Sequence, residues 1–239
     1  MTRLRRTEKM RRDFVANVSD ELRSPAAAIR AAAESLLAGA LEESDQARRF
    51  AESIAKQASR LGRLVDDLLS LARIESGALQ LDKQRVDVES LARRLAEQNA
   101  SPASDRDMRI EIDIEKGLAV LADPAAFETI LQNLLDNAIK YGEKGGTVTI
   151  LARRTAGRIR IEVRDTGPGI EPRHRERVFE RFYRVDKGRS REQGGTGLGL
   201  SIVKHLAEAM GGAVGLEQNS PRGSIFWVEL DAAGKPETC

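Results

Sequence analysis

Two asparagines separated by four positions form a polar pair within a largely apolar segment. Asn133 and Asn137 lie in residues 131–139, so they would share one face of a helix. Carboxamide oxygens are suitable ligands for Mg²⁺, which keeps several waters and is held largely through substrate phosphates. Lys140 and Tyr141 follow, and they offer a positive charge for phosphate and an aromatic face for a purine. Taken alone, the segment fits a helix-capping asparagine among surface residues equally well.

A second polar group starts where a strand-like alternation ends. Asp165 is followed by Gly167 and Gly169. A carboxylate just beyond a strand end can accept a proton from the amino group of adenine, and glycines let the backbone approach the ring. Each glycine singly could also mark an ordinary turn.

A third group is a glycine-rich run that leads straight into a helical pattern. Its members are Gly194, Gly195, Thr196, Gly197, Leu198 and Gly199. Glycines ahead of a helix N-terminus expose amide N–H groups and the positive end of the helix dipole, an arrangement that suits polyphosphate. A single run of this kind is weak evidence of a site.

Two long helices are predicted at the N-terminal end, at about residues 5–41 and 44–75. Their apolar residues recur at helical spacing, and Pro25 predicts a bend or a boundary in the first helix. The seam of the second helix comprises Phe50, Ile54, Gln57, Leu61, Leu64, Leu68 and Leu71. Two amphipathic helices cannot bury both apolar faces alone, so we predict a homodimer through residues 1–76 that forms a four-helix bundle. A monomeric hairpin folded against the rest of the chain is the alternative.

The remainder of the chain predicts an α/β sandwich, and the whole an α+β fold. Strands are predicted at Leu79–Leu81, Met108–Ile114, Thr147–Arg153, Arg158–Arg164, Ala213–Glu217 and Ser224–Leu230, with helices at about 88–100, 124–140 and 198–210. This order gives a mixed sheet covered by one layer of helices. Residues 170–196, poor in apolar periodicity, predict a lid or binding loop. The predicted domains are residues 1–76 and 77–232, with 233–239 as a tail.

Composition narrows the class of protein. The net charge of the 239 residues is +2, so the overall charge does not indicate a nucleic-acid partner. Six of the first twelve residues are basic, which fits either a solvated helix start or a segment beneath a membrane. No run of 18 apolar residues predicts a membrane span, and the single Cys239 suits a reducing compartment.

The three polar groups, in this order and spacing, resemble the N, G1 and G2 boxes of the ATPase superfamily that contains histidine kinases, gyrase, Hsp90 and MutL (the GHKL or Bergerat fold). Residues 179–186, Phe-Glu-Arg-Phe-Tyr-Arg-Val-Asp, resemble the F box of histidine kinases in particular. The resemblance implies that ATP binds to the following residues: Asn133, Asn137, Lys140, Tyr141, Asp165, Gly167, Gly169, Arg184, Gly195, Thr196, Gly197, Leu198 and Gly199. It implies Mg²⁺ on Asn137 with Asn133 beside it, contacts of Arg184 and Lys140 with phosphates, and a mobile lid at 170–196.

Residues 19–25, Ser-Asp-Glu-Leu-Arg-Ser-Pro, resemble the phosphoacceptor segment of sensor histidine kinases, Ser-His-Glu-Leu-Arg-[Ser/Thr]-Pro. Asp20 therefore stands where the family has the histidine that attacks the γ-phosphate. Glu21 matches the acid that orients or deprotonates that histidine, and Ser24 matches the residue that positions water when a response regulator is dephosphorylated. Asp20 and Ser24 lie one helical turn apart and can face outward together.

An aspartate is charged at pH 7 and cannot act as a neutral nitrogen nucleophile. We therefore expect this chain to bind Mg-ATP without autophosphorylation. His174, in the predicted lid, and His205, on the helix after the glycine run, are expected to be packing or surface residues rather than substitute acceptors.

The first hypothesis is the cytoplasmic core of a bacterial sensor histidine kinase, whose sensing and inner-membrane parts lie outside this chain and whose partner is a receiver domain. A natural pseudokinase that regulates a partner by conformation is the alternative. A gyrase- or Hsp90-like ATPase is disfavoured by the bundle and the F-box resemblance.

Overall fold

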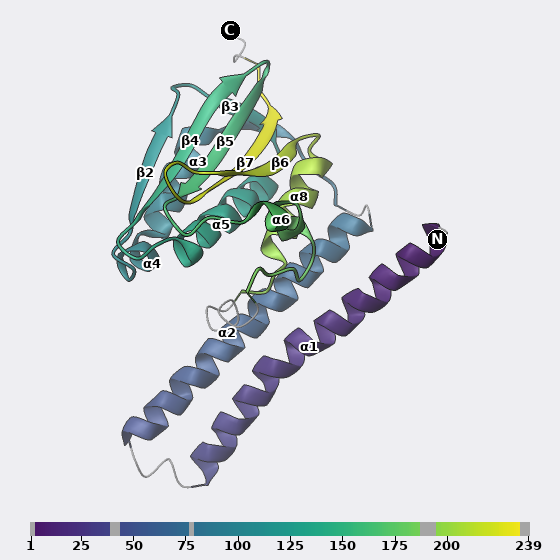
Figure 1. The fold of residues 1–239 in the computed structure, drawn as a ribbon, viewed down its shortest axis with the longest axis vertical. Helices are drawn as coiled ribbons and strands as arrows, with labels where there is room; N and C mark the ends of the chain where they lie inside the picture. The colour runs from purple at the N-terminus through teal and green to yellow at the C-terminus, as the bar shows by residue number, and fades with distance from the viewer. Residues whose placement is uncertain (1–2, 39–43, 77–78, 187–194, 235–239) are drawn as a thin grey trace. The chain divides into compact units, whose positions relative to one another are not determined.

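Two long helices begin the computed structural model (Figure 1). Helix α1 spans Arg3–Leu37 and α2 spans Ser44–Glu75. The structure describes residues 3–38, 44–76, 79–186 and 195–234. The chain falls into two units, Met1–Ser70 with Asp186–Leu198 and Leu71–Val185 with Gly199–Cys239.

Apolar and half-buried residues alternate with exposed ones along the hairpin at three- and four-residue steps. Ala32 and Leu64 are buried, whereas Val15, Val65 and Leu69 are exposed large hydrophobic side chains. Packing of the two helices therefore leaves these three apolar side chains exposed. None of the helices in the described ranges is long and apolar enough to cross a membrane.

Helix α1 runs through Pro25 without an interruption, so the boundary that this proline suggested is wrong. Proline has no N–H group and cannot donate the bond that the Glu21 carbonyl would accept in a regular helix. The helix ends at Leu37 rather than near residue 41, while the predicted second helix, 44–75, is confirmed.

A five-stranded mixed sheet forms the centre of the second unit. Its order is β2 (Arg109–Ile114), β4 (Thr147–Thr155), β5 (Arg158–Asp165), β7 (Ser224–Asp231) and β6 (Ala213–Gln218). Strands β2 and β4 are parallel, and the other neighbours are antiparallel. The mixed sheet predicted from the pattern is confirmed.

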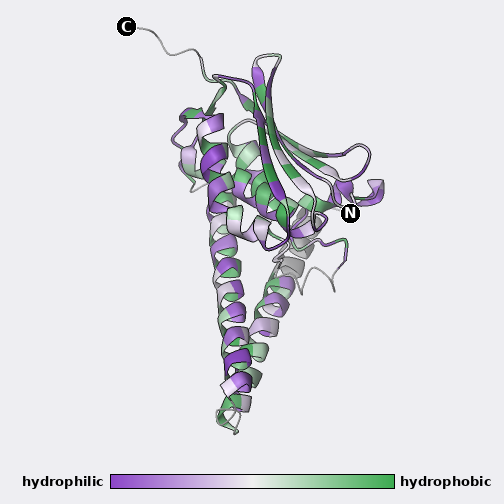
Figure 2. Ribbon diagram, turned by 90° about the vertical axis from the view of Figure 1, so that its left-hand side faces the viewer, coloured by the Kyte–Doolittle hydropathy of each residue, from purple (hydrophilic) through white to green (hydrophobic). Residues whose placement is uncertain are grey.

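Helices cover one face of this sheet (Figure 1). They are α3 (Val88–Gln98), α4 (Ala100–Ser104), α5 (Pro124–Tyr141) and α8 (Gly199–Ala209), with the short α6 (Pro172–Arg175) and η2 (Arg177–Phe179) before α8. Buried residues alternate with half-buried ones along β4 and β7. Figure 2 shows hydrophobic and hydrophilic segments in both the helices and the strands. Phe127 and Ile130 of α5 and Ile150 and Ile161 of the sheet are among the fully buried side chains.

Two predicted elements need correction. Residues Leu79–Leu81 form no strand; instead β1 (Gln84–Asp87) pairs antiparallel with β3 (Ala119–Ala122), which the pattern did not predict. Strand β1 has one apolar residue in four, so it lacks the alternation that identifies a strand. The predicted loop at 170–196 contains α6 and η2, and its residues 187–194 lie outside the described ranges.

Candidate nucleotide and phosphotransfer sites

Helix α5 supplies the asparagine pair. Asp123 caps the helix by accepting the Ala126 amide proton at 2.9 Å, and Pro124 occupies the first turn, where a missing N–H costs nothing. Asn133 and Asn137 are half-buried, one turn apart on this helix. The Asn133 amide group donates to the Thr129 carbonyl at 2.8 Å, which fixes the direction of its carboxamide oxygen.

That oxygen lies against the first residue of helix α8. A Cβ atom placed on Gly199 would lie 2.4 Å from Oδ1 of Asn133, so any larger residue would displace the carboxamide. The absence of a side chain therefore lets the amide ligand approach the N-terminus of an 11-residue helix. The structure thus places the asparagine pair of α5 next to the last glycine of the glycine-rich run.

Lys140 and Tyr141 end helix α5. The Lys140 ammonium lies 5.6 Å from the centre of the Tyr141 ring, and Tyr141 is exposed. A cation and an aromatic face thus stand together one turn beyond Asn137, where they are suited to a phosphate and a purine.

Asp165 ends strand β5 and is buried. Its Oδ1 accepts the Gly167 amide proton at 2.8 Å and the Ser224 amide proton at 3.3 Å. Burial raises the pKa of this carboxyl, and the bonds from Gly167 and Ser224 oppose the rise. Because Oδ1 already accepts two hydrogen bonds, Oδ2 is the oxygen that is suited to accept a hydrogen bond from a ligand.

The backbone around Asp165 is packed too closely for side chains. A Cβ on Gly167 would lie 2.9 Å from both Oδ1 of Asp165 and the Tyr141 carbonyl oxygen. Gly169 has φ +76° and Gly223 has φ +119°, and a Cβ on Gly223 would lie 1.9 Å from the Asp165 carbonyl oxygen. Asn219 donates to the same carbonyl at 2.8 Å. The turn between β6 and β7 thus packs against the backbone of Asp165 and donates a hydrogen bond to its carbonyl oxygen.

The F-box-like segment is held by ring contacts within the second unit. Phe179 packs edge-on against Phe226 of β7, with 6.4 Å between ring centres. The guanidinium of Arg177 lies 4.2 Å from the Tyr183 ring centre, and Tyr183 also bonds the Nδ1 atom of His174. Arg184 follows and is half-buried. His174 thus contacts an F-box residue, while His205 bonds the Ser201 carbonyl within α8.

Four residues of the glycine run, Gly195, Thr196, Gly197 and Leu198, belong to the first unit; Gly194 lies outside the described ranges. The Thr196 hydroxyl donates to Oδ2 of Asp67 on α2 at 2.8 Å and accepts the Leu198 amide proton at 3.2 Å. Gly197 has φ +74°. This end of the run is therefore held by α2, and only Gly199 is described in the unit that contains Asn133 and Asp165.

The residues predicted for phosphotransfer lie on α1. The Asp20 side chain is 68% exposed and forms an ion pair with Arg23 at 3.4 Å. Ser24 is exposed one turn further along. Both side chains are therefore accessible from solvent.

Glu21 behaves differently from its neighbours. Its Oε2 lies 3.1 Å from Nη2 of Arg60 on α2, and the side chains of the pair are only 13% and 10% exposed. Glu21 was predicted from the sequence, whereas its partner Arg60 was not. The available signal was an arginine one turn before Leu64 on the apolar face of α2. Ser224, Gly223 and Asn219 were also missed, because their link to Asp165 depends on strand pairing.

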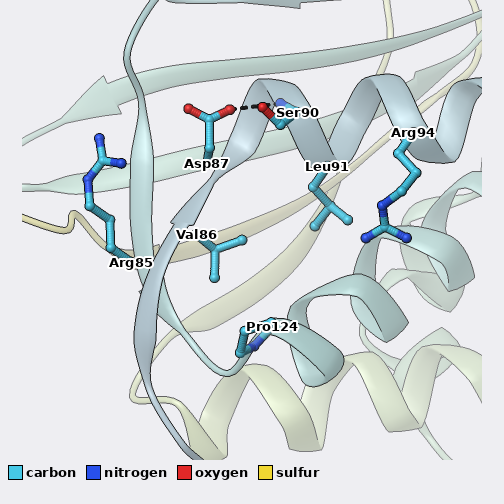
Figure 3. Close-up of a pocket in the computed structure, with 7 residues that line it drawn as sticks. All are labelled: Arg85, Val86, Asp87, Ser90, Leu91, Arg94 and Pro124. Carbon is cyan, nitrogen blue, oxygen red and sulfur yellow. Dashed lines mark hydrogen bonds between the residues drawn. The ribbon is translucent and has the colours of Figure 1, made fainter.

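A separate pocket of about 420 Å³ lies beside α3 (Figure 3). Its lining comprises Arg85, Val86, Asp87, Ser90, Leu91, Arg94 and Pro124. The Asp87 side chain caps α3 by accepting a hydrogen bond from the Ser90 amide. Arg94 pairs with Glu128 through two hydrogen bonds of 2.6 and 3.0 Å. None of the predicted site residues lines this pocket, so we do not assign the nucleotide to it.

Two family models match the chain. Residues 10–77 match the His Kinase A (phospho-acceptor) domain, and residues 122–234 match the histidine kinase-, DNA gyrase B- and HSP90-like ATPase. The sensor-like histidine kinase SenX3 of Mycobacterium tuberculosis is 42% identical over 227 residues, which are 95% of this chain and 55% of the relative. The sensor protein SrrB of Staphylococcus aureus is 32% identical over 237 residues, 99% of this chain and 40% of the relative. The chain thus spans about half the length of these relatives.

Solved structures that resemble this chain include the following two proteins. Full-length ShkA in complex with AMPPNP has a TM-score of 0.69 and 34% identity, covering 81% of this chain and 40% of that one. The histidine kinase ThkA in complex with the response regulator TrrA has a TM-score of 0.76 over 97% of this chain and 64% of that one. At 22% identity, the second similarity concerns the fold alone.

Proposed function

Because the chain belongs to the sensor histidine kinases, we propose that it is a kinase core that binds Mg-ATP and is arrested before phosphoryl transfer. Residues 1–76 would be the dimerisation and phosphotransfer hairpin, residues 77–232 the ATP-binding domain, and 233–239 a tail. The family reaction passes the γ-phosphoryl of ATP to a hairpin histidine and then to an aspartate of a response regulator. In this proposal the chain is the cytoplasmic portion of a membrane-anchored sensor.

The observation that carries the nucleotide part is the buried carboxylate of Asp165. Its Oδ1 is fixed by two backbone amides, so Oδ2 is preorganised to accept the amino proton of adenine. The contact of Asn133 with Gly199 supports a neighbouring phosphate and metal site, and the AMPPNP complex of ShkA supports ATP as the nucleotide. Lys140, Arg184 and the glycine run from Gly195 to Gly199 would contact the phosphates, and Tyr141 would cover adenine.

Asp20 is the reason for the arrest. Its carboxylate is shorter than an imidazole and negatively charged, and it would have to approach an anionic triphosphate beside a second acid, Glu21. Carboxylates accept phosphoryl groups in other enzymes, but they need a cation-rich pocket for it. Here the cation that contacts Asp20 is the exposed Arg23.

Mg²⁺ would be held by the Asn137 oxygen, with Asn133 beside it, and by the ATP phosphates. Replacing Asn137 by alanine should remove most of the dependence of ATP affinity on Mg²⁺, a loss of roughly 10- to 100-fold. Calorimetric titration with ATP, with and without Mg²⁺, measures this difference. Asp136→Ala, an exposed neighbour on the same helix, should keep the Mg²⁺ dependence, and an equal loss in both variants would contradict the assignment.

A homodimer through residues 1–76 would cover the exposed apolar side chains Val15, Val65 and Leu69. A response regulator would then dock on the outer face that carries Asp20 and Ser24. The complex of ThkA with TrrA supports a partner of this class. Asp20 adds a carboxylate to that face, which carries less charge than a phosphoryl group.

Phosphatase activity should survive in this chain, because it uses the Ser24 hydroxyl and water rather than the acceptor. Ser24→Ala should slow dephosphorylation of a phosphorylated receiver domain roughly 10- to 100-fold through loss of water positioning. Release of phosphate from the receiver over time measures the rate. Ser19→Ala, whose hydroxyl bonds the Val15 carbonyl, is the control that should keep the rate. Equal rates in the parent and Ser24→Ala would remove Ser24 from the site.

A natural pseudokinase is the alternative that Asp20 itself favours. Such a protein would bind ATP and regulate a partner by conformation alone. The two functions differ in one result: a histidine at position 20 should restore phosphorylation in an arrested kinase and leave a pseudokinase inactive.

A further inference from the structure

The F-box-like segment contains a residue with a strained backbone. Phe182 has φ +59°, in the left-handed region that a bulky L-residue seldom adopts. Such a conformation persists only where the surrounding contacts fix the chain, and it is often found at functional segments. Tyr183 and Arg184 follow directly. The backbone at Phe182 therefore determines the point from which the Arg184 side chain extends.

The residues before Phe182 are fixed by the body of the second unit. Helix η2 packs against α8, and the Phe179 ring contacts the Phe226 ring of β7 at 6.4 Å between centres. The Glu180 amide donates to the Arg177 carbonyl at 2.8 Å and closes the turn after η2. The N-terminal side of the strained residue is thus anchored on the sheet and on α8.

Tyr183 anchors the chain on the other side of Phe182. Its hydroxyl is hydrogen-bonded to Nδ1 of His174 on α6, and both side chains are half-buried. The guanidinium of Arg177 lies 4.2 Å from the centre of the tyrosine ring, a cation–π distance. Among the described residues, His174 is the hydrogen-bond partner of this hydroxyl. The bond therefore ties the residue next to Arg184 to a separate helix.

We propose that His174 is a positioning residue for the nucleotide site: through the Tyr183 hydroxyl it holds the strained turn so that Arg184 extends toward the ATP phosphates. The inference rests on the proposed function, which assigns Arg184 to those phosphates. Arg184 also takes part in another interaction, so the bond to His174 fixes its backbone rather than the whole side chain. Loss of the bond should weaken phosphate binding and leave the adenine contact of Asp165 intact.

Two variants remove this hydrogen bond from opposite ends. Tyr183→Phe deletes the hydroxyl and keeps the ring under Arg177, while His174→Phe keeps a ring without its nitrogen atoms. We expect each variant to weaken ATP binding about three- to tenfold, the effect of one lost hydrogen bond. Calorimetric titration measures the ATP affinity. Adenosine, which lacks phosphates, should bind both variants as it binds the parent chain, as an NMR titration would show.

Three further variants separate positioning from other effects. His174→Asn, whose amide group can take the place of Nδ1, should keep most of the ATP affinity. Arg173→Met breaks an exposed ion pair with Glu171 beside His174 and should leave the affinity unaltered. Arg184→Met should weaken ATP binding roughly 10- to 150-fold, the effect of losing a hydrogen bond to a charged group. Adding Tyr183→Phe to it should cost little more, because both changes act through one contact.

A purely structural role predicts a different result. ATP and adenosine affinity would then fall together, and the effects of Tyr183→Phe and Arg184→Met would add. Either result, or unaltered ATP binding by Tyr183→Phe, would overturn the inference alone. If circular dichroism shows that His174→Phe does not fold, the more conservative Tyr183→Phe decides. Unaltered ATP binding by Arg184→Met, or no ATP binding by the parent chain, would overturn the proposed function and this inference with it.

Discussion

Asp165→Asn should weaken ATP binding roughly 10- to 150-fold, the effect of losing a hydrogen bond to a charged group. The asparagine oxygen can still accept the amide protons of Gly167 and Ser224, so the local backbone keeps its bonds. The new amide group would then occupy the position of Oδ2 and present hydrogen atoms to the adenine amino group. Two donors cannot bond each other, so the loss falls on the ligand rather than on the fold.

The stability of Asp165→Asn gives an independent check. Burial raises the folded-state pKa of Asp165, so the folded chain binds this proton more readily than the unfolded chain. The stabilisation from protonation is complete below the unfolded pKa and is lost as pH rises through the folded pKa. Asparagine cannot ionise, so the variant should be at least as stable as the parent at neutral pH. Its stability relative to the parent should fall as the pH is lowered through that range.

Calorimetric titration with ATP and thermal unfolding at several pH values measure both effects. The matched control is Asp113→Asn, which removes an exposed carboxylate that pairs with Arg153. It should change ATP affinity little. Unaltered ATP binding by Asp165→Asn would remove this residue from the nucleotide site.

Gly223→Ala should destabilise the second unit by roughly 2–6 kcal/mol, the sum of backbone strain at positive φ and overpacking. The new Cβ would lie 1.9 Å from the Asp165 carbonyl oxygen at φ +119°, and that oxygen belongs to the backbone, which cannot rotate away. ATP affinity of the remaining folded protein should also fall, because the turn carrying Gly223 braces Asp165. The free energy of unfolding in urea and ATP titration below the transition measure the two losses.

Gly157→Ala separates strain from the clash. Gly157 also has a positive φ, +85°, but a Cβ there would meet nothing within 4 Å. It should cost about 1–2 kcal/mol, the strain of a left-handed residue alone, and leave ATP affinity unchanged. Equal losses in Gly157→Ala and Gly223→Ala would show that contact with Asp165 is unimportant.

The parts of the fold with strong periodicity could be predicted from the sequence. Helix α2 and the antiparallel strands β4 and β5 have long, regular patterns, and the structure places them where the pattern does. Strand β1 could not be found, because its pairing with β3 rather than its own composition makes it a strand. Pro25 predicted a bend or a boundary, and the structure has no boundary there, since the surrounding helix tolerates one missing hydrogen bond.

The candidate sites show the same division. The spacing of Asn133 and Asn137 and the acid at the end of β5 were visible as local patterns. The hydrogen bond from the Ser224 amide to Asp165 joins residues that are 59 positions apart and depends on the register of the sheet. The hydrogen bond between Arg60 and Glu21 joins residues that are 39 positions apart. Contacts over such separations are set by tertiary packing, which local patterns do not encode.

The central claim, a kinase core arrested only at its acceptor, is tested most directly by incubation of the parent chain and Asp20→His with γ-labelled ATP. Both proteins should bind ATP with equal affinity. The account predicts acid-labile, base-stable label on Asp20→His and none on the parent, with transfer of the label to a cognate receiver domain. Label on the parent chain, or no label on either protein despite equal ATP binding, would contradict it.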